Sequence, residues 1–199
     1  SAVTYQTFNI TNPADPFTGM SGISSLSSEH HPRYWDIYAD KLYDKFQVVS
    51  CKLTAQFLST AVTSPHAYFI VPASTENKAE VKTMLDDTST FAPRLKEANP
   101  RARIKIAAST TNESGHAWLS CAQNIAKLEG IKDKRDVDTL QGTTASSGTE
   151  AAPARLPVMY VGVGALNASV DLPVFTCMVK SEQVILFTGL TLDTEGAAV

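Results

Sequence analysis

The segment from Pro32 to Phe57 constrains the fold more than any other part of the sequence, because the hydrophobic period changes within it. Between Trp35 and Phe46, apolar residues recur at steps of three and four, which is the period of one face of a helix. From Phe46 onward the period becomes two, which is typical of a strand with one buried face. The segment therefore predicts a short amphipathic helix that leads directly into a long strand.

Most of the remaining chain consists of strand-like runs separated by turns and long loops. Strands are predicted over 2–10, 66–71, 101–107, 116–128, 156–166 and 174–192, a helix over 77–87, and long loops over 12–31 and 132–153. Strands and helices do not alternate, and no Gly-rich phosphate loop is present. The pattern predicts an all-β fold, an eight-stranded antiparallel jelly-roll sandwich with short helical insertions and long loops, as a single domain over 1–199.

The same alternation selects the residues expected in the core. They are Leu53, Phe57, Phe69, Ile104, Ile106, Val161, Ile185 and Phe187. Trp35 and Trp118 stand within apolar patterns, so core packing is favoured for both over stacking on nucleic-acid bases. The three cysteines also lie in apolar runs, and their odd number provides no disulfide framework. We expect buried free thiols and a reducing compartment.

The aromatic block around the start of the long strand is similar to that of one family. Its residues are Trp35, Tyr38, Leu42, Tyr43, Phe46, Val48, Lys52 and Phe57. The block resembles that of the single jelly-roll capsid proteins of small circular single-stranded DNA viruses. Three later segments resemble the same family in the same order: KLEGIKDKRD with the Gly/Thr/Ser-rich loop after it, LPVMYVGV, and SEQVILFTGLTL. The resemblance covers most of the chain, but the basic N-terminal arm of the family is absent, and the loop before His31 has no counterpart.

The resemblance implies a coat protein that self-assembles into a minimal icosahedral shell, about 60 copies around a single-stranded nucleic acid genome. It implies a virion location, with assembly inside the host cell, the nucleus being a candidate compartment. The interface candidates are Trp35, Tyr38, Tyr43, Asp136 and Asp138, in the aromatic helix and the 132–153 loop. Packaging is expected to depend mainly on the missing arm, because a net charge of −3 argues against strong nucleic-acid binding by this segment.

Arg101, Arg103 and Lys105 are the local candidates for contact with nucleic acid, because they alternate with small and apolar residues along one predicted strand. Cations on one strand face are spaced by about 6.6 Å, close to the phosphate repeat of an extended strand. The alternative is a solvated edge strand on which charge prevents unwanted pairing.

The sequence motifs provide no catalytic set and no metal centre. His30 and His31 stand in a loop without the spacing of a zinc site, so solvated histidines are expected. The acidic run from Asp133 to Asp138 fails the EF-hand pattern, because Leu140 and Gln141 stand where an oxygen ligand and Gly are required. We expect no cofactor, and an inter-subunit calcium ion remains the less favoured alternative.

A second function is compatible with the same features. A carbohydrate- or ligand-binding β-sandwich of the lectin type would also have long loops and no catalytic residues. No apolar run approaches the roughly 20 residues that span a bilayer, and the N-terminus lacks the pattern of a signal peptide, so no membrane partner is expected.

Overall fold

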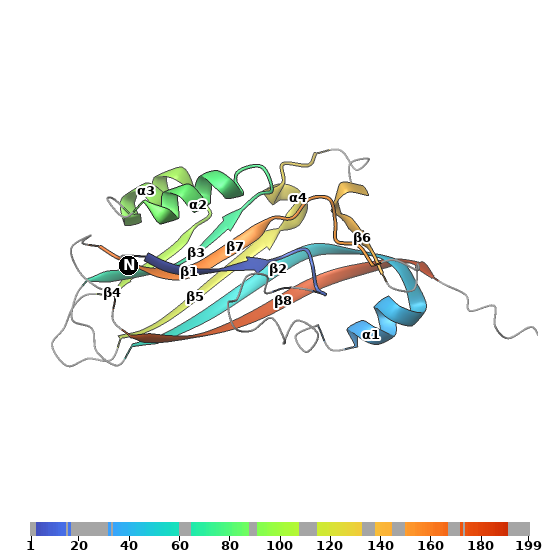
Figure 1. The fold of residues 1–199 in the computed structure, drawn as a ribbon, viewed down its shortest axis with the longest axis horizontal. Helices are drawn as coiled ribbons and strands as arrows, with labels where there is room; N and C mark the ends of the chain where they lie inside the picture. Colours follow the sequence, from blue (N-terminus) through green and yellow to red (C-terminus); the bar gives the residue numbers. More distant parts are fainter. Residues whose placement is uncertain are drawn as a thin grey trace, which may run out of the picture.

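The described part of the chain forms eight strands in two antiparallel sheets (Figure 1), in a computed structural model. The structure describes residues 3–14, 16, 32, 34–59, 65–87, 91–107, 115–132, 138–144, 150–166, 172 and 174–190. Sheet A has the order β1 (Val3–Asn9), β7 (Val158–Ala165), β3 (His66–Ala73) and β4 (Arg103–Ala107). Sheet B is built around β2 (Tyr43–Ser59), which pairs with β5 (Gly115–Asn124), β6 (Gln141–Thr143) and β8 (Phe175–Leu190).

The predicted eight-stranded antiparallel sandwich with helical insertions is confirmed, and its winding has a distinctive order. β1 lies beside β7, and β8 lies beside β2. This order differs from the common jelly-roll winding, in which the first strand lies beside the last, and β3 and β4 are also consecutive neighbours in one sheet. β2 is therefore a central strand, with β5 and β6 end to end along one edge and β8 along the other.

Two helices cover the outer face of sheet A (Figure 1). They are α2 (Lys78–Asp86), which confirms the predicted helix, and α3 (Phe91–Ala98), which the sequence pattern did not reveal. Their buried side chains pack on the outward residues of β3 and β7 in a cluster with Phe69 and Tyr160. As a result, β3 and β7 are buried along their whole length. This explains why both strands are almost continuously apolar.

The larger core lies between the sheets. Phe57 is completely buried there, and its ring stacks on Tyr68 with the centroids 4.6 Å apart. Of the predicted core residues, Leu53, Phe57, Phe69 and Val161 are buried, whereas Ile104, Ile185 and Phe187 are half-buried. Ile106 is 60% exposed, so its assignment to the core was wrong. The three half-buried residues and Ile106 lie on β4 and β8, which are edge strands with a described neighbour on one side only.

Several predicted boundaries shift. The aromatic helix is short, with α1 (Trp35–Ile37) followed by a π-helical turn, η2 (Tyr38–Leu42), and β2 begins at Tyr43. The predicted strand over 116–128 ends at Asn124, whose side chain accepts a hydrogen bond from Lys127 N and caps α4 (Ile125–Leu128). The predicted 132–153 loop contains β6, and Thr143 also forms a bridge to Ala151.

A buried carboxylate joins the turns at one end of the sandwich. The Glu129 side chain is fully buried and accepts hydrogen bonds from Thr75 N at 2.8 Å and from Thr75 Oγ1 at 3.1 Å. Its second oxygen lies 3.3 Å from Arg155 Nη1. Since each oxygen has a donor, the charge is compensated in place. The contact ties α4 to the turns before α2 and β7.

Candidate assembly surfaces

Four exposed side chains form an aromatic patch on α1 and η2. Tyr34, Ile37, Tyr38 and Leu42 are 54%, 48%, 42% and 36% exposed, respectively. Tyr34 has a φ of 68°, a left-handed conformation that is uncommon for a bulky residue. A gathering of large apolar side chains at a protein surface is typical of an interaction site. The interface candidate Tyr38 belongs to this aromatic patch.

Beneath the aromatic patch, a ring cluster attaches the helix to sheet B. Trp35 is 5% exposed, and its ring lies 5.1 Å from Phe46 and 5.8 Å from Phe187, centroid to centroid. The Tyr38 ring stacks on the Phe187 ring, with the centroids 5.4 Å apart. The ring of half-buried Tyr43 also lies next to Phe187, with a centroid distance of 5.5 Å. Trp35 is thus packed in the interior, as its apolar pattern indicated, and its role is to hold the patch in place. Its side chain is not available as an interface contact.

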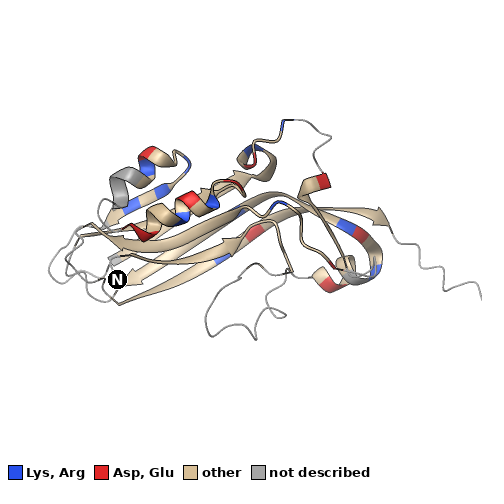
Figure 2. Cartoon of the chain, turned by 45° about the horizontal axis from the view of Figure 1, so that its top comes forward, with Lys and Arg blue, Asp and Glu red and all other residues tan. Residues whose placement is uncertain are grey.

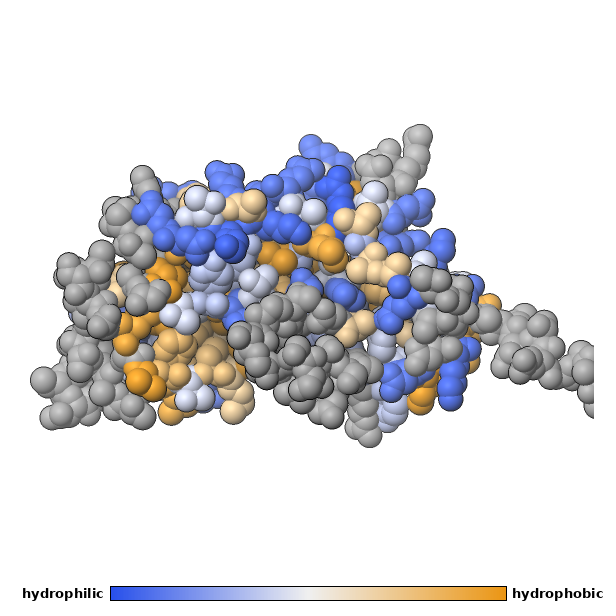
Figure 3. All heavy atoms as spheres, viewed as in Figure 1, coloured by the Kyte–Doolittle hydropathy of each residue, from blue (hydrophilic) through white to orange (hydrophobic). Residues whose placement is uncertain are grey.

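The outer face of sheet B carries a second apolar region, at the end of the sheet opposite the aromatic patch. Leu58, Trp118, Met178 and Val174 are 48%, 56%, 70% and 85% exposed, respectively. Figure 3 shows apolar surface at the left end of the molecule, where β2, β5 and β8 lie in Figure 1. The expectation that Trp118 lies in the core was wrong. The signal was in the sequence: Ala117, Leu119 and Cys121 alternate with His116, Trp118 and Ser120, and the first set faces inward.

Trp118 is held by a polar contact with its neighbours. Its indole Nε1 donates a hydrogen bond to His116 Nε2 at 3.1 Å, and the Gln56 side-chain amide lies 3.1 Å from the same nitrogen. Because an indole N–H can only donate, His116 Nε2 is the acceptor in this contact. The arrangement orients the Trp118 ring on the outer face of sheet B.

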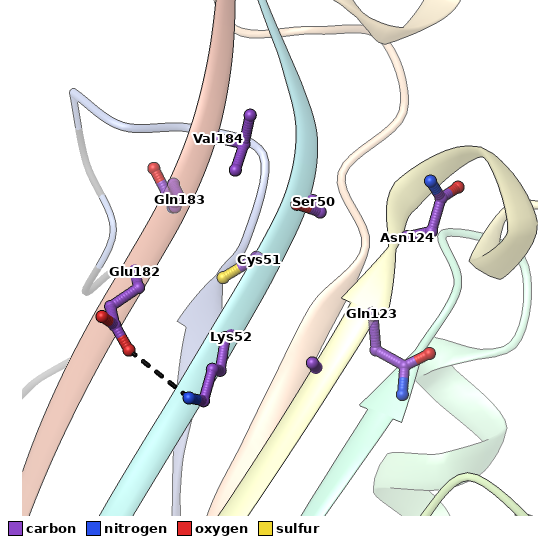
Figure 4. Close-up of a pocket in the computed structure, with 9 residues that line it drawn as sticks. Ser50, Cys51, Lys52, Gln123, Asn124, Glu182, Gln183 and Val184 are labelled. Atoms are coloured by element: carbon purple, nitrogen blue, oxygen red, sulfur yellow. Dashed lines mark ion pairs between the residues drawn. The ribbon is translucent and has the colours of Figure 1, made fainter.

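A hollow of about 400 Å³ opens on sheet B where β2 bulges between Val48 and Ser50. It is lined by Ser50, Cys51, Lys52, Ala122, Gln123, Asn124, Glu182, Gln183 and Val184. Figure 4 shows Lys52 and Glu182 reaching toward each other, 3.8 Å apart. The Ser, Gln and Asn side chains of the lining can form hydrogen bonds with a ligand. The two charged side chains, Lys52 and Glu182, form an ion pair with each other.

The basic candidates do not form one face. Arg103 and Lys105 are exposed neighbours on β4, opposite Ile70 and Tyr68 of β3. Arg101 lies in the turn before the strand, and its guanidinium donates to the Lys127 carbonyl at 3.1 Å. Figure 2 shows that basic and acidic residues are interspersed along α2 and α3. The local positive charge is therefore confined to a short edge strand.

The remaining candidates are placed as follows. Asp138 is exposed, whereas Asp133, Asp136, His30 and His31 lie outside the described residues. Among the residues that the structure describes, no three His, Cys, Asp or Glu side chains converge as metal ligands. Within the same residues, no helix has the length and apolar character needed to cross a bilayer.

The cysteines are free thiols, as predicted. Cys51 and Cys121 are buried, and Cys177 is half-buried. Burial raises the pKa of the Cys51 and Cys177 thiols to about 11 and also raises the pKa of Cys121. Because the thiolate is the reactive form, these side chains are poor nucleophiles at neutral pH.

Comparison with known proteins adds no family assignment. No protein-family model matches the chain, and no curated protein matches it.

Proposed function

We propose that this chain is the shell subunit of a small icosahedral capsid that encloses a single-stranded nucleic acid genome. The observation that carries the proposal is the folding of the Pro32–Phe57 block. Its aromatic half packs on the start of a 17-residue strand through Trp35 and at the same time exposes the aromatic patch. The resemblance between this block and circular single-stranded DNA virus capsid proteins makes this surface the first candidate for contact between copies.

The distribution of exposed apolar side chains supports assembly. One apolar region lies on α1 and η2, and the other lies at the far end of sheet B around Trp118 and Met178. A closed shell uses different patches of each copy against its neighbours, so a subunit needs more than one such surface. Tyr38, Tyr43 and Asp138 are the described interface candidates that remain.

In this proposal the chain is structural and performs no catalysis. The packaged genome would be neutralised mainly by basic residues outside this segment, and Arg103 and Lys105 would add a minor contribution. The virion and the compartment in which it assembles belong to the same proposal.

The first test is assembly itself. We expect closed particles in negative-stain images and a matching fast species in sedimentation velocity, measured on the 199-residue chain and on the product of its complete gene. Ile37→Asp should abolish the particles, because a charge at the centre of an apolar contact is desolvated without a partner. Ala79→Asp is the matched control, since it adds the same charge at an exposed site on α2.

Two results would contradict the proposal. One is a chain that stays monomeric or dimeric at micromolar concentration across salt and pH. The other is particle formation that Ile37→Asp leaves unchanged. In the first case, binding of carbohydrates to the hollow on sheet B becomes the function to examine, because its Ser, Gln and Asn side chains are typical hydrogen-bonding partners for a small polar ligand.

The second test concerns nucleic acid. We expect weak, salt-sensitive binding of single-stranded oligonucleotides by the 199-residue chain. Replacing both Arg103 and Lys105 with Gln should lower the slope of log K against log salt by about 1.4, because each lost phosphate contact on a single strand contributes about 0.7. Lys82→Gln, on α2, is the control for a lost positive charge. An unchanged slope in the double variant would exclude the β4 cations as contacts.

A further inference from the structure

Among the residues that the structure describes, the long C-terminal strand β8 has a neighbouring strand on one edge only. β8 runs for 16 residues antiparallel to β2, and among the described residues β2 is its sole partner. Within the described part of the chain, no strand pairs with the backbone groups on its other edge. An edge strand of this length without protection is a template for pairing with another chain.

The side chains of β8 favour pairing along this edge. The strand contains no proline, and its residues alternate between exposed and half-buried along most of its length. Cys177, Val179 and Ile185 point inward but are only half-buried, and Met178 and Val184 on the outer face are 70% and 60% exposed. A neighbouring strand would remove apolar surface from water on both faces.

The charges at the centre of β8 indicate which strand fits. Lys180 and Glu182 stand two residues apart on the outer face, with their charged atoms 3.0 Å from each other. We propose that β8 pairs antiparallel with β8 of a second copy over Cys177 to Ile185, about a two-fold axis at Ser181. In this register Lys180 lies opposite Glu182 of the second copy, and Glu182 lies opposite its Lys180.

The side-chain period limits the registers that compete. A shift of one residue would place inward side chains opposite outward ones, which the sandwich core forbids. The nearest permitted two-fold registers centre on residue 180 or on residue 182. They place Lys180 opposite Lys180 or Glu182 opposite Glu182, and like charges directly opposite each other destabilise a pair of strands.

The proposed register also matches the apolar residues. Met178 lies opposite Val184 of the second copy, and Cys177 lies opposite its Ile185. A lone central lysine on an edge would prevent pairing by repulsion. In β8, Glu182 follows Lys180 by two residues. In the proposed register, each Lys180 therefore faces a Glu182 of the other copy, and the two identical strands attract each other.

This inference rests on the proposed function and deepens it, because it identifies the contact at the two-fold axes of the shell. Sheet B of one copy would continue into sheet B of the next. An isologous contact of this kind closes on itself and leaves α1, η2 and the other end of the sandwich free for the remaining contacts.

Charge reversal tests the register. Dimerisation is measured by sedimentation velocity in the 199-residue chain carrying Ile37→Asp, so that shell contacts through the aromatic patch are removed. Lys180→Glu alone and Glu182→Lys alone should each raise the dissociation constant at least about tenfold, because two attractions become two repulsions. An equimolar mixture of the two variants should dimerise again, and so should the double variant Lys180→Glu with Glu182→Lys.

Lys82→Glu is the matched control, because Lys82 also belongs to an exposed ion pair, with Asp86 on α2. It should leave dimerisation unchanged. A chain that remains monomeric without the charge reversals, or a mixture that does not recover the dimer, would overturn the inference. An equal rise in the dissociation constant of the dimer in the Lys82→Glu chain would also overturn it.

The two proposals fail in distinguishable ways. Particles that form equally well with Lys180→Glu contradict the β8 contact and leave the shell function intact. Charge-dependent dimers in a chain that forms no particles support the contact and contradict the shell.

Discussion

Phe57→Ala is expected to lower the free energy of unfolding by about 3–5 kcal/mol, measured by equilibrium denaturation in guanidinium chloride. Phe57 is 0% exposed, stacks on Tyr68, and lies 6.4 Å from the Phe175 ring, centroid to centroid. It occupies the centre of the layer between the sheets, where the rigid strands on either side limit collapse into the vacated space. The cost therefore includes a cavity as well as lost burial.

Leu58→Ala is the internal control for this change. Leu58 is the next residue on β2, but its side chain points to the outer face and is 48% exposed. Its replacement should change stability by no more than about 1 kcal/mol. Similar losses at the two positions would show that the inward and outward faces of β2 have been misassigned.

Gly162→Ala is expected to lower the free energy of unfolding by about 3 kcal/mol, which is at the upper end of the range for substitutions that overpack a core. Gly162 lies in β7 between Tyr5 of β1 and Phe69 of β3. A Cβ there would lie 2.6 Å from Tyr5 Cβ and 2.8 Å from Phe69 Cζ, and it would also collide with the Thr4 carbonyl. Since a backbone oxygen cannot move independently, β1 would have to separate from β7.

Two measurements would identify this mechanism. Hydrogen exchange should show that β1 amides lose protection before those of β3, because β1 pairs with β7 alone among the described strands. Gly130→Ala provides the comparison, since Gly130 has a φ of 69° and no atom within 4 Å of the added Cβ. Its cost should be limited to backbone strain of about 1–2 kcal/mol. Equal costs at the two glycines, with β1 protected, would contradict the predicted collision.

Local pattern was sufficient for much of the fold. The period of two in β2 identified Leu53 and Phe57 as buried, and the periodicity of 77–87 identified α2. These predictions succeed because a side chain's direction along a regular element follows from its position in the sequence. The prediction that Trp118 lies in the core was wrong for a local reason too. It relied on the apolar residues around Trp118, whereas the alternation along β5 places this side chain on the outer face.

Other features depend on neighbours that are remote in sequence. Ile106 alternates as a core residue should, but it lies on an edge strand and is exposed. The sequence presents three equivalent basic residues, Arg101, Arg103 and Lys105. In the structure, Arg101 lies in the turn before β4, and its guanidinium donates a hydrogen bond to the Lys127 carbonyl. Neither outcome can be derived from spacing, because strand order and loop contacts set the environment.

The sequence by itself thus determined the all-β class, the strand faces and the aromatic segment that leads into β2. The tertiary structure decided that β8 is a long edge, that β2 lies at the centre of its sheet, and that Gly162 admits no side chain. The physical reason is that periodicity fixes which way a side chain points within its own element. Which strands become neighbours is decided by packing between segments that are distant along the chain.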